Sequence, residues 1–130
     1  MPITVLLSDD KEVIRNSIRP LLNSDPEIQL VGEAVTFDQT IQSAIDLKPQ
    51  IIVMDVHRPE VAPVRPREIK SLLKSLGSQL IAISFRKDES TEVRARSLGA
   101  AILLDKAVLV TELIAVIRAA STMNNCPAHR

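Results

Sequence analysis

Short apolar runs alternate with longer amphipathic segments along the chain. Five of the short runs have the length of β-strands, and they lie at Ile3–Leu7, Ile28–Ala34, Ile51–Met54, Leu80–Ile83 and Ala101–Leu104. All but the second are apolar at nearly every position, which is typical of parallel strands that are covered on both faces. The second contains Gln29 and Glu33, and we therefore expect it at an edge of the sheet.

The segment between the first two runs, residues 11–23, has apolar residues at helical spacing. One face of this predicted helix carries Val13, Ile14, Ile18, Leu21 and Leu22. Pro20 lies inside the segment, and we expect it to kink or shorten the helix because proline has no amide hydrogen and clashes with the preceding turn.

Capping and helix-breaking residues place the other helices. Thr36 and Gln39 have the spacing of a capping box, so a helix is expected from there through Leu47, with Pro49 behind it. The remaining helices are expected over about 67–76 before Gly77, from a cap at Asp88 to Gly99, and over about 109–121. In the last helix the inward side chains are Leu109, Leu113, Val116, Ile117 and Ala120. Residues 59–66, with three prolines, are expected to form a stiff loop.

Strand and helix alternate five times, and this order predicts an α/β fold, a five-stranded parallel sheet flanked by five helices. We expect the strand order 2-1-3-4-5 because it is common in flavodoxin-like sheets; no residue of the chain decides it. A chain of 130 residues is long enough for one hydrophobic core. We expect a single domain over residues 1–122 and a flexible tail over residues 123–130.

Polar side chains follow four of the five strands. Asp9 and Asp10 come after the first strand. Asp55 follows the third strand, Ser84 the fourth and Lys106 the fifth. Because the carboxyl ends of parallel strands share one rim, where ligands bind near the switch in strand order, we expect these five side chains to lie together.

Each of these residues also has a simpler interpretation. An aspartate after a strand is most often a turn former or a helix cap, so Asp55 or Asp10 alone indicates little. Lys106 alone is equally consistent with a solvated loop charge. The combination, five polar residues at the ends of four strands, favours a reaction site.

Three carboxylates in one pocket require positive charge. Two carboxylates about 5 Å apart repel each other by about 3 kcal/mol at an effective dielectric constant near 20, and Lys106 supplies one positive charge. Oxygen ligands with room for water or phosphate favour Mg²⁺, and the lack of a His/Cys cluster argues against structural zinc. The imidazole of His57, a lone histidine in a loop, is expected to be solvated or hydrogen-bonded and not a ligand.

Composition narrows the classes of protein. Sixteen basic residues balance sixteen acidic ones, so no overall charge attracts nucleic acid or an anionic membrane. Cys126 is the only cysteine, which excludes an internal disulfide. No apolar run approaches the roughly 18 residues of a membrane span, and the N-terminus lacks the layout of a secretory signal. We expect a cytoplasmic protein that binds no membrane and, through this chain, no nucleic acid.

At the strand ends the sequence resembles the receiver domains of two-component response regulators, and the resemblance covers nearly the whole chain. It is carried by SDD at 8–10, MDVHRP at 54–59, IAIS at 81–84 and LGAAILLDK at 98–106. The stretches IQLVGEA and KPQIIVMD, at 28–34 and 48–55, are most similar to receivers of the NarL/FixJ/LuxR type, whose full proteins carry a C-terminal helix-turn-helix. The resemblance implies a CheY-like fold and a regulatory phosphoprotein domain that is not an enzyme.

The resemblance also implies a role for each site residue. Asp55 is the phosphoacceptor for a phosphohistidine of a sensor histidine kinase. Asp10, Asp55 and the backbone carbonyl of His57 hold Mg²⁺ directly, and Asp9 acts mainly through a bound water. Lys106 pairs with the phosphoryl oxygens, and Ser84 moves toward them. The formal charges of the three carboxylates, Mg²⁺ and the lysine sum to zero before transfer and to about −1 afterwards.

The same resemblance implies partners. The face of the fourth helix, the fifth strand and the fifth helix contacts an output domain or a downstream protein, and homodimerisation is left open. The chain departs from many receivers at Leu103, where Tyr or Phe is frequent, and at Ile102, where Gly is common. An aromatic switch coupled to Ser84 therefore cannot operate in its usual form. Arg58, where Met is frequent, is expected to point to solvent, with pairing to Asp55 or phosphate as the alternative.

Two other functions compete with a phosphorylation switch. A receiver-like interaction module that no longer switches is favoured by the departure at Leu103. A flavin-binding electron carrier would need a hydroxyl- and glycine-rich loop after the first strand. The carboxylates of SDDKEV, residues 8–13, would instead repel a cofactor phosphate, and the chain has two Phe and no Trp or Tyr to stack on a ring. We expect no flavin.

Overall fold

The computed structural model describes residues 2–57 and 66–124 of the chain. Five strands alternate with helices in the order β1 (Ile3–Ser8), α1 (Glu12–Asn23), β2 (Ile28–Ala34), α2 (Phe37–Leu47), β3 (Ile51–Asp55), α3 (Pro66–Leu76), β4 (Gln79–Ser84), α4 (Glu89–Ser97), β5 (Ile102–Asp105), the 3₁₀ turn η1 (Lys106–Val108) and α5 (Leu109–Asn124). The predicted alternation is confirmed. Strands β3 and β4 each end on the polar residue expected just beyond them, so the strand backbone itself holds Asp55 and Ser84. Strand β1 ends at Ser8, directly before Asp9, and β5 ends at Asp105, directly before Lys106.

The five strands form one parallel sheet in the order β2-β1-β3-β4-β5, as expected. Neighbouring strands are in register at their carboxyl ends, where Ser8 pairs with Met54 and Asp55 pairs with Ile83. Ser84 in turn pairs with Asp105 of β5. This register sets the polar ends of four strands along one rim.

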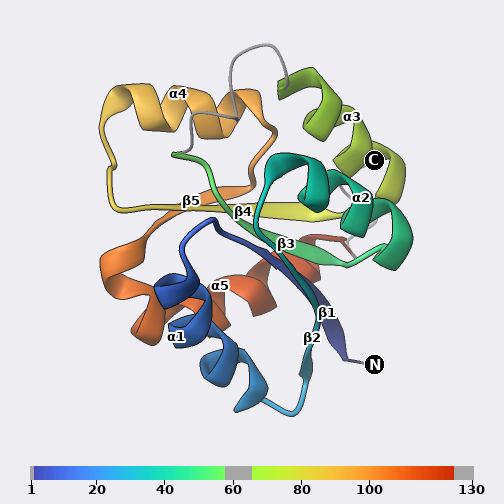
Figure 1. Ribbon diagram of the computed structural model, residues 1–130, viewed down its shortest axis with the longest axis vertical. Coiled ribbons are helices and arrows are strands. Elements are labelled where there is room, and N and C mark those ends of the chain that lie inside the picture. Colours follow the sequence, from blue (N-terminus) through green and yellow to red (C-terminus); the bar gives the residue numbers. More distant parts are fainter. Residues whose placement is uncertain (1, 58–65, 125–130) are drawn as a thin grey trace.

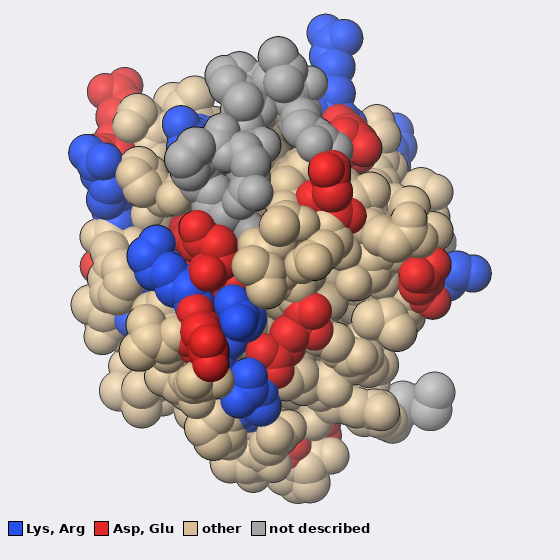
Figure 2. Space-filling view, viewed as in Figure 1, with Lys and Arg blue, Asp and Glu red and all other residues tan. Residues whose placement is uncertain are grey.

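Helices cover both faces of the sheet, with α1 and α5 on one face and α2, α3 and α4 on the other (Figure 1). One core cluster joins α1 and α5 to the sheet and includes Ile18, Leu22, Leu113 and Ile117; the second joins the other three helices to it and includes Phe37, Ile69 and Leu98. Of the residues of α5 expected to face inward, Leu109, Leu113, Ile117 and Ala120 are buried, and Val116 is half-buried. Acidic and basic side chains are interspersed over the face seen in Figure 2, in keeping with the balanced composition.

Two expectations about packing are wrong. Val13 is 71% exposed, because the core face of α1 is the row of Ile14, Ile18, Leu21 and Leu22, and Val13 lies to one side of it. Strand β5 is not covered on both faces: it is an edge strand of this order, and Ile102 is 41% exposed. Of the kink or shortening expected at Pro20, the shortening does not occur, since α1 continues past it to Asn23.

The helix ends follow the expected chemistry. The capping box of Thr36 and Gln39 is present at α2. Gly77 and Gly99, which follow α3 and α4, have positive φ angles of 68° and 85°, which glycine adopts at low cost. The expected stiff loop lies outside the described residues except for Pro66, the first residue of α3, and the expected tail lies outside them beyond Asn124. None of the described helices combines the length and apolar character that crossing a membrane requires.

The cap of α4 leads to a prediction about pH. Hydrogen bonds from the hydroxyl and amide of Thr91 and from the Ser90 hydroxyl lower the pKa of Asp88 from 3.8 to about 2. Because the pKa of Asp88 is lower in the folded protein than in the unfolded chain, its carboxylate stabilises the fold at pH values above the unfolded-state pKa. This contribution is lost as the pH falls through the folded-state pKa. Asp88→Ala should therefore destabilise the protein at pH 7, and its deficit relative to wild type should shrink between pH 4 and pH 2.

Urea unfolding followed by circular dichroism at pH 7, 5 and 3 measures this deficit. Asp46→Ala, which removes another exposed helix carboxylate, is the matched control. A deficit for Asp88→Ala that is equal at all three pH values would contradict the assignment of the cap.

Candidate functional site

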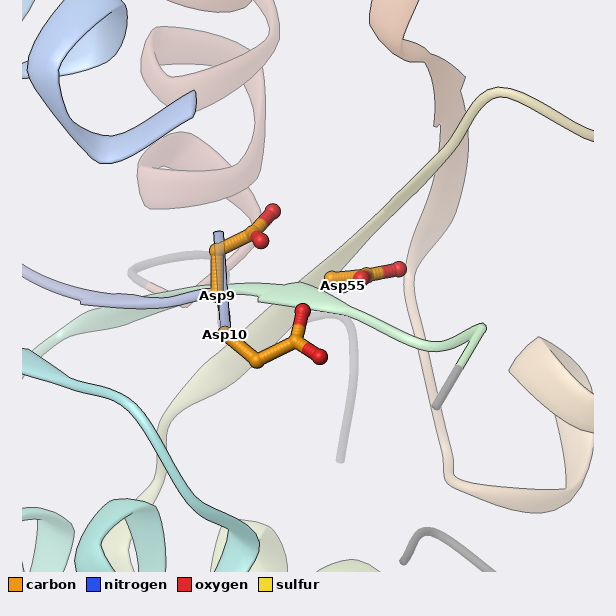
Figure 3. A group of neighbouring side chains, drawn as sticks. All are labelled: Asp9, Asp10 and Asp55. Atoms are coloured by element: carbon orange, nitrogen blue, oxygen red, sulfur yellow. The ribbon is translucent and has the colours of Figure 1, made fainter. Parts of the chain in front are cut away.

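The carboxylates of Asp9, Asp10 and Asp55 meet at the carboxyl ends of β1 and β3 (Figure 3). Each side chain offers one carboxylate oxygen, and these oxygens all lie within 4.8 Å of one another. Asp9 and Asp55 are buried, at 0% and 2% exposure, whereas Asp10 is exposed at the mouth of the site. The expected convergence of the three aspartates from two separate strands is confirmed.

Lys106 brings an ammonium group into the same cluster. Its Nζ lies 2.8 Å from Oδ2 of Asp9 and 3.4 Å from Oδ2 of Asp55, and its side chain is 2% exposed. The alternative of a solvated loop charge is therefore excluded. The turn η1 directs Lys106 inward: Oδ1 of Asp105 accepts a hydrogen bond from the amide of Ala107, which starts the turn at the end of β5.

Backbone amides hold two of the carboxylates in place. Oδ1 of Asp9 accepts a hydrogen bond from the amide of Lys11, and Oδ1 of Asp55 accepts one from the amide of His57, each at 2.9 Å. Such bonds to the amide two residues on are local turns that orient a carboxylate. In both residues the other oxygen, Oδ2, faces Lys106. No side chain caps α1, so the interpretation of Asp10 as a helix cap is wrong.

Ser84 is fully buried at the end of β4, and its Oγ accepts a hydrogen bond from the amide of Arg86 at 3.0 Å. Leu103 is half-buried and packs against the core cluster of α2, α3 and α4, as a core residue would. The imidazole of His57 is exposed, and its Nε2 lies 3.2 Å from Nη1 of Arg86, in keeping with a hydrogen-bonded ring. Arg58 lies outside the described residues.

The donor set fits a hard divalent cation. Oδ2 of Asp9 is buried and accepts no well-aligned hydrogen bond from the described part of the chain, although Lys106 lies beside it. Opposite ligands of octahedral Mg²⁺ are about 4.2 Å apart, twice the Mg–O distance. The spread of the three carboxylate oxygens, within 4.8 Å, is close to this span. The three carboxylates have the buried ammonium of Lys106 beside them and the exposed ammonium of Lys11 3.6 Å from Oδ1 of Asp10, which leaves an excess of negative charge that also favours a cation.

Sequence analysis missed three residues of this site. Phe85 places its ring 5.4 Å from Nζ of Lys106, within cation–π range, while remaining 61% exposed. Arg86 bonds Ser84 through its amide and approaches His57 through its guanidinium. Arg15 donates from Nη1 to the backbone carbonyl of Asp9 at 2.7 Å. Phe85 and Arg86 could have been predicted as site residues because they directly follow Ser84 in the sequence. No local sequence pattern indicated the contact between Arg15 and Asp9.

Together the fold and the site define a CheY-like α/β domain with an acidic cluster and a lysine at the carboxyl ends of its strands. Comparisons with known proteins agree, although no protein-family model matches the chain. The chain is 32% identical over 99 residues to the nitrate/nitrite response regulator protein NarL of Escherichia coli K12, covering 76% of the chain and 45% of NarL. It is 27% identical over 116 residues to the response regulator GacA of Pseudomonas syringae, covering 89% of the chain and 54% of GacA.

Solved structures give the same picture of the fold. The non-phosphorylated receiver domain of RcsB from Escherichia coli superposes with a TM-score of 0.82 at 18% identity, covering 95% of each chain. The response regulator domain of Thermotoga maritima CheB superposes with a TM-score of 0.79 at 24% identity, covering 94% of this chain and 98% of that domain. The chain belongs to the receiver domains of response regulators. It spans about half the length of NarL and GacA.

Proposed function

We propose that this receiver, residues 1–122, is a cytoplasmic switch in two-component signalling that accepts a phosphoryl group on Asp55 from a sensor histidine kinase. One observation carries the proposal. Asp55 ends β3 within the cluster of three carboxylates, and its Oδ2 lies 3.4 Å from the ammonium of Lys106. A nucleophilic carboxylate beside a fixed cation and a cation-binding cluster suits phosphoryl transfer.

The reaction is a displacement at phosphorus. A carboxylate oxygen of Asp55 forms the new P–O bond while the P–N bond of the donor phosphohistidine breaks, and the bonding electrons return to the imidazole nitrogen. Lys106 stabilises the charge on the equatorial phosphoryl oxygens. The product is an acyl phosphate, and water later releases inorganic phosphate from it and restores the carboxylate. The chain then regulates a partner and is not itself an enzyme.

Asp10, Asp55 and the backbone carbonyl of His57 would hold Mg²⁺ directly, as the resemblance implies, and Asp9 would act through a water. When bound there, the metal would neutralise negative charge on the phosphoryl oxygens during transfer. The amide of His57 already donates to Asp55, so the β3–α3 turn holds the acceptor and the carbonyl ligand together. Asp9, buried and paired with Lys106, keeps the lysine in the site.

Ser84 carries the signal from the site. Its hydroxyl is buried at the end of β4 and accepts from the amide of Arg86, so turning toward a phosphoryl group changes the β4–α4 loop. The face formed by α4, β5 and α5 then alters its binding to an output domain or a downstream protein, or to a second copy of the chain. Leu103 is the switch residue on β5 that stands where other receivers have an aromatic ring.

Beryllofluoride, a phosphoryl mimic, tests this function when it is added with Mg²⁺ to the full chain and followed by amide NMR. We expect saturable shifts at Asp55, His57, Ser84 and Arg86, and further shifts in α4 and β5. Binding should be lost without Mg²⁺. Absence of any shift at the site in saturating beryllofluoride and Mg²⁺ would reject the phosphoacceptor role.

A second candidate function is an interaction module that does not switch, and the aliphatic Leu103 favours it. Half-buried in the core, this side chain has no ring to turn between an exposed and a buried position. The same NMR titration separates the two candidates. Shifts that stop at the site residues and leave α4 and β5 unchanged would support the module and contradict the switch.

A further inference from the structure

Arg15 connects helix α1 to the acidic cluster through the main chain. Its Nη1 donates a hydrogen bond to the backbone carbonyl of Asp9 at 2.7 Å, and its Nε lies 3.5 Å from Oε1 of Glu33 on β2. The side chain is 14% exposed, low for an arginine on a helix that borders solvent. One guanidinium thus bridges the end of β1 and the edge strand.

Glu33 is in turn held by a second arginine. Nε and Nη2 of Arg19 donate to the two carboxylate oxygens of Glu33 at 2.5 and 2.9 Å. This bidentate geometry fixes the plane of the guanidinium relative to the plane of the carboxylate. This hydrogen bonding, with the charges of Arg19 and Arg15 adding to it, lowers the pKa of Glu33 below its ordinary value despite partial burial. Glu33 is therefore ionised at neutral pH and remains a fixed anchor for Arg15.

Acidic and basic side chains alternate in Figure 2 over the region where Figure 1 shows α1 and β2. Arg15 and Arg19 of α1 and Glu33 of β2 are ion-paired between these two elements. Most surface ion pairs contribute little to stability. The Arg15 network differs because its innermost bond goes to a main-chain atom of the acidic loop. At the junction of this loop with α1, the amide of Lys11 donates to Oδ1 of Asp9, and Nζ of Lys11 lies 3.6 Å from Oδ1 of Asp10. Arg15 adds a contact to the Asp9 carbonyl, which neither of these two reaches.

We propose that Arg15 is a positioning residue that holds the peptide between Asp9 and Asp10 and thereby sets the affinity of the acidic cluster for Mg²⁺. The inference rests on the proposed function, because it assigns Mg²⁺ to that cluster. The carbonyl of Asp9 belongs to the peptide plane that leads directly into Asp10. Fixing that plane limits the directions in which the exposed Asp10 carboxylate points, and a preorganised ligand binds a metal more tightly than a mobile one.

Charge and position make opposite predictions for Arg15. As a nearby positive charge, the guanidinium repels Mg²⁺, so removing it would tighten binding if charge alone mattered. As a positioning group, its loss weakens binding. Lysine keeps the charge but lacks the planar fork needed to reach Asp9 and Glu33 together. The sign of the change in Arg15→Gln and the size of the change in Arg15→Lys therefore separate the two effects.

The experiment titrates the metal-free full chain with Mg²⁺ alone and follows the amides of the β1–α1 and β3–α3 loops by NMR. We expect both variants to bind Mg²⁺ about tenfold more weakly, the lower end of the range for groups that orient metal ligands. Glu33→Gln should weaken binding by a smaller factor. Arg118→Gln is the matched control, because Arg118 also pairs with two carboxylates, Asp25 and Glu27, but on α5 away from the site.

Each outcome decides the inference. The inference is supported if both Arg15 variants bind Mg²⁺ more weakly while Arg118→Gln binds it like wild type. The metal-free Arg15 and Arg118 variants should then show similar decreases in melting temperature. Unchanged or tighter binding by Arg15→Gln, while wild type binds Mg²⁺ normally, overturns the positioning role and leaves the proposed function intact. If wild type itself binds no Mg²⁺ at this cluster, the metal site and the inference fall together. If Arg15→Gln does not fold, the affinity measured for Arg15→Lys decides.

Discussion

We expect Asp55→Asn to abolish labelling of the chain by acetyl phosphate in the presence of Mg²⁺. The substitution keeps the shape of the side chain but replaces the nucleophilic carboxylate oxygen with an amide that cannot form a stable acyl phosphate. The loss should be complete, because Asp9 is buried against Lys106 and Asp10 lies at the mouth of the site, so neither is placed as Asp55 is. Intact-protein mass spectrometry detects the added phosphoryl group directly.

The matched control for this experiment is Asp46→Asn. Asp46 lies exposed on α2 and accepts a hydrogen bond from Gln42 on the same helix, so its loss should leave labelling at the wild-type level. Stoichiometric labelling of Asp55→Asn would assign the acceptor elsewhere, and peptide mapping would then locate it. Failure of wild type to label, with beryllofluoride binding intact, would point to a donor requirement and not to a defective site.

We expect Lys106→Met to destabilise the metal-free protein by about 3 kcal/mol or more. The ammonium lies 2.8 Å from Asp9 and 3.4 Å from Asp55, and both carboxylates are buried. Removing one partner of a buried ion pair leaves the other charge uncompensated, which typically costs about 3–5 kcal/mol. Because methionine fills a volume similar to that of lysine, the decrease in stability should reflect the lost charge more than lost packing.

Urea unfolding followed by circular dichroism measures this loss, since the chain has no Trp or Tyr for fluorescence. Saturating Mg²⁺ should reduce the deficit, because the metal neutralises the same carboxylates. Adding Asp9→Asn to Lys106→Met should also recover part of the stability, because it removes the buried charge of Asp9 that the loss of Lys106 exposes to repulsion. Lys74→Met, at an exposed position of α3, should change stability by no more than about 0.5 kcal/mol. A deficit below about 1 kcal/mol for Lys106→Met would contradict the assigned ion pairs.

The site residues could be predicted from the sequence because of one geometric property of parallel sheets. Every strand points the same way, so a polar residue at the end of each apolar run must lie on the shared rim. Asp9, Asp10, Asp55 and Lys106 were placed together on this ground, and the structure brings them within ion-pair or ligand distance. The same reasoning said nothing of Arg15, because its contact with Asp9 depends on how α1 packs against β2.

The sequence by itself determined the succession of strands and helices along the chain, most helix ends and the polar residues at the rim, since these follow from local periodicity and turn chemistry. Only the tertiary structure decided that Val13 faces solvent, that β5 is an exposed edge and that Lys106 is buried between two carboxylates. Burial and pairing depend on which elements become neighbours. That choice is made by packing the whole sheet between its helices, and no short segment contains it.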